Sequence, residues 1–194
     1  MKKLLLVAAL AVFGLNTINA QNVRFGAKAG VNFASLNGDD VDNIDGRTSF
    51  HVGGVANIGI TELFSIQPEV IYSSQGYSAD DDGDVTVNLD YINVPIMADF
   101  KLAEGLSLQG GAQVGFNISS KIDFDGDKDD IDGIQTIDFG VGIGAQYVLP
   151  INLFFQARYV IGITNVFEDF DGIEQEDVEA KNSVVSVSVG YFFN

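Results

Sequence analysis

Apolar and polar residues alternate along most of this chain, with the period of two that is typical of β-strands. In the first such segment Val23, Phe25 and Ala27 share one face, and small or polar residues occupy the other. The pattern recurs in eight segments, at residues 23–33, 50–60, 64–73, 85–98, 106–118, 137–147, 153–164 and 185–193. The sequence therefore predicts an all-β chain of eight strands.

The predicted strands are long, at about ten to fifteen residues each. Strands of globular proteins usually have about five or six residues, whereas strands that cross a membrane need about nine to eleven. Strand length therefore favours a membrane barrel. Periodicity alone does not say which face points outward, so a soluble lipocalin-like periplasmic carrier with the faces reversed stays open.

Short and long connections alternate between the predicted strands. Three are tight (61–63, 103–105 and 150–152) and four are long (37–47, 78–84, 121–133 and 165–182). Short periplasmic turns opposite long extracellular loops are the layout of outer-membrane barrels. We expect an eight-stranded antiparallel up-and-down transmembrane β-barrel, integral to the outer membrane, with both termini periplasmic.

The fourth segment changes parity. Its apolar residues fall on odd positions from Val85 to Tyr91 and on even positions from Ile92 to Ala98. One extra residue in a strand switches the face on which later side chains lie. The pattern therefore predicts a bulge near Tyr91.

Charge and composition exclude several functions. The 194 residues carry a formal charge of −17, from 27 acids and 10 bases, so nucleic-acid binding through a basic surface is excluded. The chain has no Cys and a single His, which excludes disulfides, thiolate sites and multi-histidine metal sites. The four long connections hold 4, 4, 6 and 7 acids, 21 of the 27, so acidic extracellular loops are expected.

The N-terminus has the pattern of a secretory signal peptide. Lys2 and Lys3 precede an apolar run over residues 4–15, and the small residue Ala20 follows. We expect cleavage after residue 20, which leaves residues 21–194 as the barrel domain. No Cys follows the site, so a lipoprotein anchor is not expected.

The last predicted strand ends in aromatic residues at 191–193. It resembles the terminal strand by which the outer-membrane assembly machinery recognises barrels. Together with the stretches 25–32, 65–72, 91–96, 157–159, 162–165 and 190–193, it makes residues 22–194 resemble the small outer-membrane β-barrel family of the Bacteroidetes, also seen in the gliding and secretion protein PorT. The resemblance implies a non-enzymatic barrel in contact with outer-membrane lipid and lipopolysaccharide, and a transport or secretion role is an alternative.

Three charged residues lie on the predicted inner face, each about five residues from the turn end of its strand: Lys28, Glu69 and Arg158. An unpaired buried charge is expensive, so Glu69 is expected to pair with Arg158 or Lys28. Three glutamines can join this group: Gln67, Gln113 and Gln156. We expect a polar plug that fills the lumen, with a gate in a narrow pore as the alternative.

Two further sites are weaker hypotheses. The run Asp123, Asp125, Asp127, Asp129 and Asp132 could supply oxygen ligands to Ca²⁺, although Lys128 occupies the turn-glycine position of the calcium-loop motif and no Glu ends it. A solvated acidic loop is the alternative.

His51, predicted inward and close to Ser49, suggests a lipid-modifying enzyme at the rim. One His beside a Ser is a weak constellation, and no enzyme is expected.

Overall fold

The computed structural model describes residues 23–38, 44–79, 85–124, 127–131, 133–166 and 180–193. These residues form nine strands: β1 (Val23–Asn37), β2 (Ile44–Gly59), β3 (Phe64–Ala79), β4 (Val85–Ala103), β5 (Leu106–Phe124), β6 (Asp127–Asp130), β7 (Ile137–Val148), β8 (Leu153–Gly162) and β9 (Lys181–Phe192). The predicted signal peptide lies outside the described residues. None of the described residues forms a helix long and apolar enough to cross a membrane.

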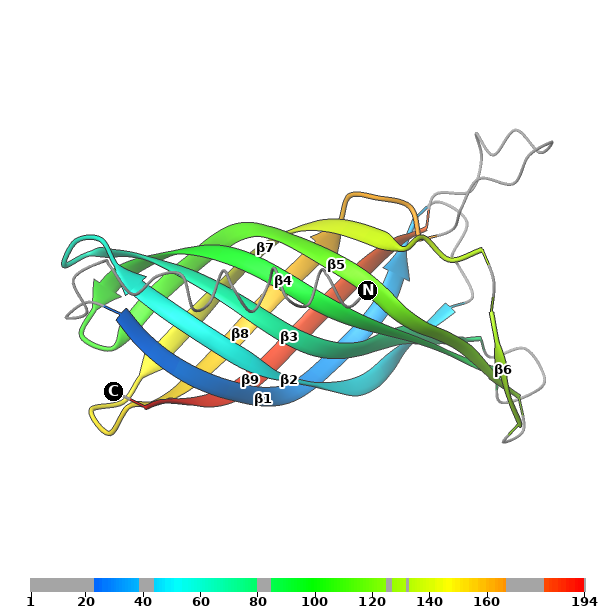
Figure 1. Ribbon diagram of the computed structural model, residues 1–194, viewed down its shortest axis with the longest axis horizontal. Coiled ribbons are helices and arrows are strands. Elements are labelled where there is room, and N and C mark those ends of the chain that lie inside the picture. The colour runs from blue at the N-terminus through cyan, green and yellow to red at the C-terminus, as the bar shows by residue number, and fades with distance from the viewer. Residues whose placement is uncertain are drawn as a thin grey trace, which may run out of the picture.

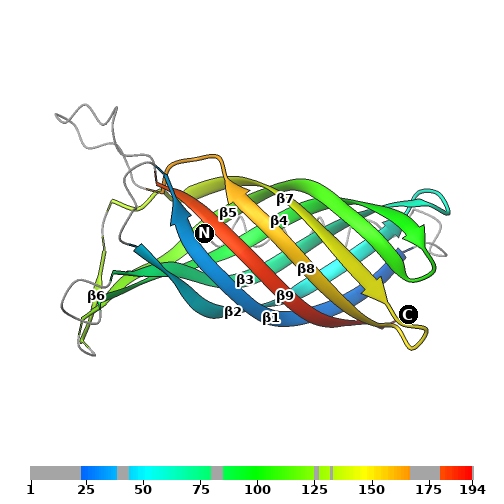
Figure 2. The ribbon, with the colours of Figure 1, turned by 180° about the vertical axis from the view of Figure 1, so that it is seen from behind.

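Eight of these strands close into one antiparallel barrel (Figures 1 and 2). Each strand pairs with its neighbours in the sequence, and the first strand β1 pairs with the last strand β9 along Gly26–Asn37. The short strand β6 lies outside the ring, paired with the end of β5. The predicted eight-stranded barrel is confirmed, and a closed barrel leaves no unpaired strand edge.

The apolar faces point outward. Large side chains stand exposed around the barrel, including Phe50 at 56%, Ile96 at 56% and Ile143 at 68% of their surface. A continuous apolar surface of this kind suits lipid rather than water. The interior instead holds charged and amide side chains, so the lipocalin-like interpretation with an apolar cavity is wrong.

The two ends of the barrel differ. The connections at residues 60–63, 104–105 and 149–152 are tight and lie at one end, which we call the turn end. The other end, the loop end, carries the longer connections. Strands β1, β2, β3, β5 and β9 extend further toward the loop end than their hydrophobic pattern predicted, because backbone pairing continues where the side chains become polar.

The bulge is present, but on the opposite strand from the one predicted. Asp90 pairs with Ser119 and Tyr91 with Asn117, which leaves Ile118 of β5 as the extra residue. Strand β4 is regular there, so its odd positions face inward throughout. The parity change in β4 therefore marks a change in the character of its inner face, which is apolar from Val87 to Tyr91 and mixed on the turn-end side, where the buried residues are Asn93, Pro95, Met97 and Asp99.

The inward apolar residues of β4 form a cluster inside the loop end. Leu89 and Tyr91 are almost completely buried, and the cluster as a whole consists of Leu36, Val87, Leu89, Tyr91, Val166 and Ala180. Backbone hydrogen bonds fix its outer members, because the Val166 amide donates to the Ala180 carbonyl and the Gln135 amide to the Val166 carbonyl. An apolar plug thus fills the barrel near its loop end.

Candidate functional site

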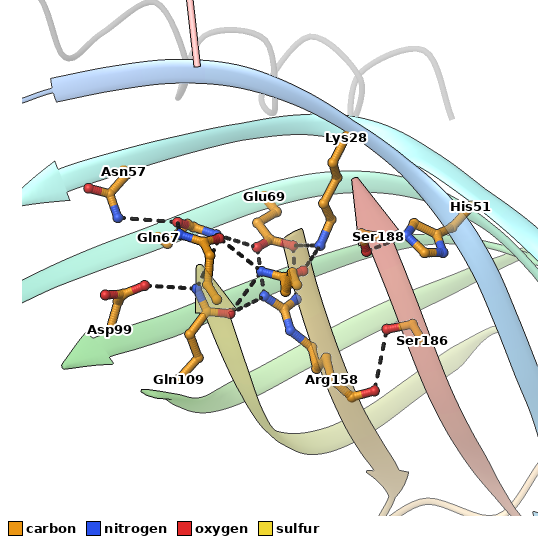
Figure 3. A network of polar contacts seen from close by, with 12 residues as sticks. Lys28, His51, Asn57, Gln67, Glu69, Asp99, Gln109, Arg158, Ser186 and Ser188 are labelled. Carbon is orange, nitrogen blue, oxygen red and sulfur yellow. Dashed lines mark hydrogen bonds and ion pairs between the residues drawn. The ribbon is translucent and has the colours of Figure 1, made fainter. Parts of the chain in front are cut away.

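A buried ion cluster crosses the middle of the lumen (Figure 3). The Glu69 carboxylate on β3 accepts two hydrogen bonds from Arg158 on β8, at 2.7 and 2.9 Å. The same carboxylate forms an ion pair with Lys28 Nζ on β1 at 2.8 Å. The sequence left the partner of Glu69 open, and the structure gives it both cations.

Simple strand geometry places these three residues together. Each lies five residues after the first residue of its strand, at Val23, Phe64 and Leu153. Each also falls on the inward face, and none of the three is more than 4% exposed. Because β1, β3 and β8 all begin at the turn end, equal distances along them bring side chains to similar heights, allowing for stagger.

Glutamines extend the ion cluster into a layer that spans the lumen. Gln67 donates to Glu69 Oε1 at 2.9 Å, and Gln156 accepts from Lys28 Nζ at 2.6 Å, so these two predicted members lie in the layer. Two members were missed. Gln109 accepts from Arg158 at 3.0 Å, and Gln146 accepts from Gln156 at 3.2 Å.

The remaining predicted glutamine, Gln113, lies apart from this layer. Its side chain makes no hydrogen bond to the layer within the described part of the chain, and it borders a small cavity on the loop-end side of the ion cluster. Gln113 pairs with Gly140 and Pro95, whereas Gln109, four residues nearer the turn end, pairs with Asp99 and Gly144. The stagger between neighbouring strands brings Gln109, rather than Gln113, level with the ion cluster. Hydrophobic periodicity along a strand does not report this stagger.

Toward the turn end the lumen opens into a vestibule of about 980 Å³. Asp99 borders it and accepts hydrogen bonds from Gln109 at 2.8 Å and Ser107 at 3.1 Å. Arg24 lies over the Phe192 ring, 4.5 Å from its centroid, and Phe192 packs against Phe154. Arg24 thus borders the vestibule and also contacts an aromatic pair near the turn ends of β8 and β9.

On the loop-end side, His51 is held by two hydrogen bonds. Its Nδ1 contacts Asn32 Oδ1 at 2.8 Å and its Nε2 contacts Ser188 Oγ at 2.8 Å. The Asn32 amide nitrogen donates to the Phe50 and Ser74 carbonyls, so Asn32 Oδ1 must accept from the histidine. Neutral His51 therefore carries its proton on Nδ1, and Ser188 donates to Nε2.

The structure does not pair His51 with Ser49, the neighbour from which a rim site was suggested. The predicted neighbour Ser49 bonds instead to the Ser74 carbonyl at 2.6 Å. Ser188 is 2% exposed, and the cavity beside His51 measures about 30 Å³, far too small for an acyl chain. The His51–Ser188 contact cross-links β2 and β9 across β1.

Gly30 makes that cross-link possible. It lies between His51 and Ser188 in the strand pairing, and a Cβ atom there would lie 2.7 Å from the His51 ring and collide with the Val187 carbonyl. We expect Gly30→Ala to lower the free energy of unfolding by about 1–3 kcal/mol, as overpacking does. Equilibrium urea unfolding in lipid vesicles measures it. Gly110→Ala is the matched control, because a Cβ there meets nothing within 4 Å, and an equal loss in both variants would contradict the explanation.

The acidic run between Asp123 and Asp132 does not form a metal site within the described residues. Asp125 and Asp132 lie outside them, and the described His, Asp and Glu residues form no group of three that could hold a metal ion. In the hairpin of β5 and β6, Asp123 pairs with Lys128, whereas Asp127 and Asp129 pair with Phe124 and Ile122. Asp123 therefore lies on the opposite face from the other two carboxylates. Calcium binding stays a prediction.

Comparison with known proteins agrees with the architecture. Residues 19–168 match the profile of a family described as outer membrane protein beta-barrel domain. No curated protein sequence matches at a significant level. Among solved structures, Neisserial surface protein A (NspA) is similar, with a TM-score of 0.57 and 18% identity over 91% of this chain and 100% of that one. The attachment invasion locus protein Ail of Yersinia pestis gives a TM-score of 0.55 and 16% identity over 89% of this chain and 100% of that one. At such identities, the likeness shows a shared fold.

Proposed function

The chain belongs to this outer membrane β-barrel domain family and is an integral outer-membrane protein, and we propose that it acts as a closed barrel that presents acidic loops at the cell surface. In this role the barrel is structural or binds partners at the cell surface, and it does not conduct ions. The motifs at 25–32, 65–72 and 190–193 support a place in the Bacteroidetes PorT-like branch. A part in a transport or secretion apparatus is the alternative that this branch implies.

The observation that carries the proposal is the filled lumen. The layer of Lys28, Glu69, Arg158 and four glutamines closes the middle, and the apolar cluster around Leu89 and Tyr91 fills the loop end. Eight strands enclose a space just wide enough for side chains. With the lumen occupied at two levels, the long loops are the parts left to meet a partner.

The closed lumen predicts an absence of conductance. We expect the purified protein, reconstituted into planar bilayers, to give no stepwise current at moderate voltage. A large porin from the same preparation procedure shows that channels would be seen. Repeated unitary openings by the unaltered protein would contradict a closed barrel and favour the gate.

The acidic composition of the long connections sets the chemistry of their partners. With 21 of the 27 acids in these segments, cationic partners are favoured and polyanions are repelled. Ail has been solved with the heparin analogue sucrose octasulfate, and we propose that this chain differs by excluding such polyanions. Calcium is the simplest cationic candidate, and a calorimetric titration without heat at millimolar Ca²⁺ would exclude it.

Orientation is a further part of the proposal. The turn end faces the periplasm, residues 1–20 are removed as a signal peptide, and the last strand meets the assembly machinery. Protease added to intact cells is then expected to cut within residues 165–179 while sparing the turns. Cleavage at 60–63 instead would reverse the orientation.

A further inference from the structure

A small cavity lies inside the barrel against the ion layer, on the side of the loop end. It measures about 30 Å³ and is bordered by Lys28 and Arg158. Its other described walls are neutral, among them Gln113, Asn93 and Ser186, and no described acid borders it. Two cations therefore face a small cavity whose described walls carry no carboxylate.

The charges of the ion layer do not balance. Glu69 is the one carboxylate bonded to Lys28 and Arg158 among the described residues, so the three groups together carry one net positive charge. Asp99 reaches Arg158 only through Gln109. A net charge withdrawn from water is costly, and the cost falls when an opposite charge is bound close by.

Two donors of these cations are also unused. Arg158 Nε is buried and has no hydrogen-bond partner among the described residues. Lys28 Nζ has three N–H groups, and the structure supplies two acceptors for them, Glu69 and Gln156. A buried charged donor without an acceptor is destabilising. The site therefore lacks a hydrogen-bond acceptor. A negatively charged acceptor would bond these donors and also neutralise the net positive charge of the layer.

We propose that this cavity binds one small monovalent anion, a halide such as chloride, between Lys28 and Arg158. A halide is close to a water molecule in size, and about 10–15 Å³ is enough for one such sphere, so the space also admits one water. That water donates to Asn93 Oδ1, a buried acceptor on the cavity wall that has no partner in the described structure. Phosphate and sulfate are too large for the space.

Unfolding equilibria test the site. Urea titrations of the protein in lipid vesicles are compared in sodium chloride and in sodium gluconate at equal ionic strength. We expect chloride at ten times its Kd to lower the equilibrium constant for unfolding about tenfold, with a further fall as chloride is raised, and gluconate to have no effect. Crystals soaked in sodium bromide are expected to show an anomalous peak between Lys28 and Arg158.

A pair of matched variants locates the effect. Gln113→Glu places a carboxylate on the cavity wall without removing a hydrogen bond of the layer, so it should abolish the response to chloride. Gln135→Glu makes the same chemical change at a residue that neither borders the cavity nor belongs to the ion layer, and should leave the response intact. Mobility of unheated samples on gels shows that both variants fold.

Several outcomes would overturn the proposal. Equal stability in chloride and gluconate, with no anomalous peak, would mean that water alone fills the cavity. A bromide peak without any gain in stability would mean binding only at soaking concentrations. A response that persists in Gln113→Glu would place the ion elsewhere. If Gln113→Glu does not fold, the bromide peak and the chloride response of the unaltered protein still decide.

Discussion

Replacing Glu69 with glutamine is expected to lower the free energy of unfolding by about 3–5 kcal/mol, the cost of leaving buried charges without their partner. The carboxylate holds a bidentate contact with Arg158 and an ion pair with Lys28. An amide of the same shape keeps the packing and removes the charge. Urea unfolding in lipid vesicles measures the loss, followed by circular dichroism because the chain has no Trp.

Two controls separate this effect from a general loss of charge. Glu62→Gln removes a carboxylate from an exposed position at the turn end, and should change stability by less than about 0.5 kcal/mol. Adding Lys28→Met to Glu69→Gln removes one of the two orphaned cations, so the double variant should be less damaged than the sum of the single variants. Strict additivity would show that the ions do not act as a unit.

Measuring the bilayer conductance of Glu69→Gln and Glu69→Ala tests whether the same ion cluster acts as a gate. In a closed barrel the remaining glutamines and the apolar cluster near the loop end still fill the lumen, so no current is expected. Conductance in the Glu69 variants, absent from the unaltered protein, would identify the ion cluster as a gate.

The second large effect is expected from Leu89→Ala. Leu89 is completely buried in the apolar cluster inside the loop end, and truncation of a buried leucine costs about 2–5 kcal/mol. Ile96→Ala on the same strand is the control, because Ile96 is exposed on the outer face, where lipid fills the space that the lost methyl groups leave. We expect a loss several times smaller there.

Comparison of the two variants also checks which way β4 faces. If Leu89 pointed to lipid, as its place in the hydrophobic pattern suggested, the two truncations would cost similar amounts. A ratio near one in the same unfolding assay would therefore contradict the inward placement of Val87, Leu89 and Tyr91.

Strand number, the tight turns and the ion cluster could be predicted because each depends on local order in the sequence. Alternation places Lys28, Glu69 and Arg158 on one face, and their equal distance from the turn end brings them level. Neither prediction depends on the stagger between neighbouring strands.

Features that depend on stagger or on the choice between two apolar surfaces could not be predicted. Gln109 and Gln146 join the layer because of where β5 and β7 sit relative to β8, which no single strand encodes. The inner run from Val87 to Tyr91 resembles a lipid-facing run, because burial in a protein core and burial in a bilayer favour the same residues. The extra residue Ile118 changes the register on β5, and the hydrophobic pattern of β4 does not indicate it.

The pairing of β1 with β9 imposes an order on assembly. Gly26 meets Phe192 and Asn37 meets Lys181, so the ring cannot close until the end of the chain has been made and delivered. Lys28 and Gln156 are 128 residues apart in sequence, and their contact forms only as the ring closes. Until then the charges of the future lumen need water. Folding is therefore expected to proceed with a hydrated, open sheet whose expulsion of water and final strand pairing occur in one late, slow step.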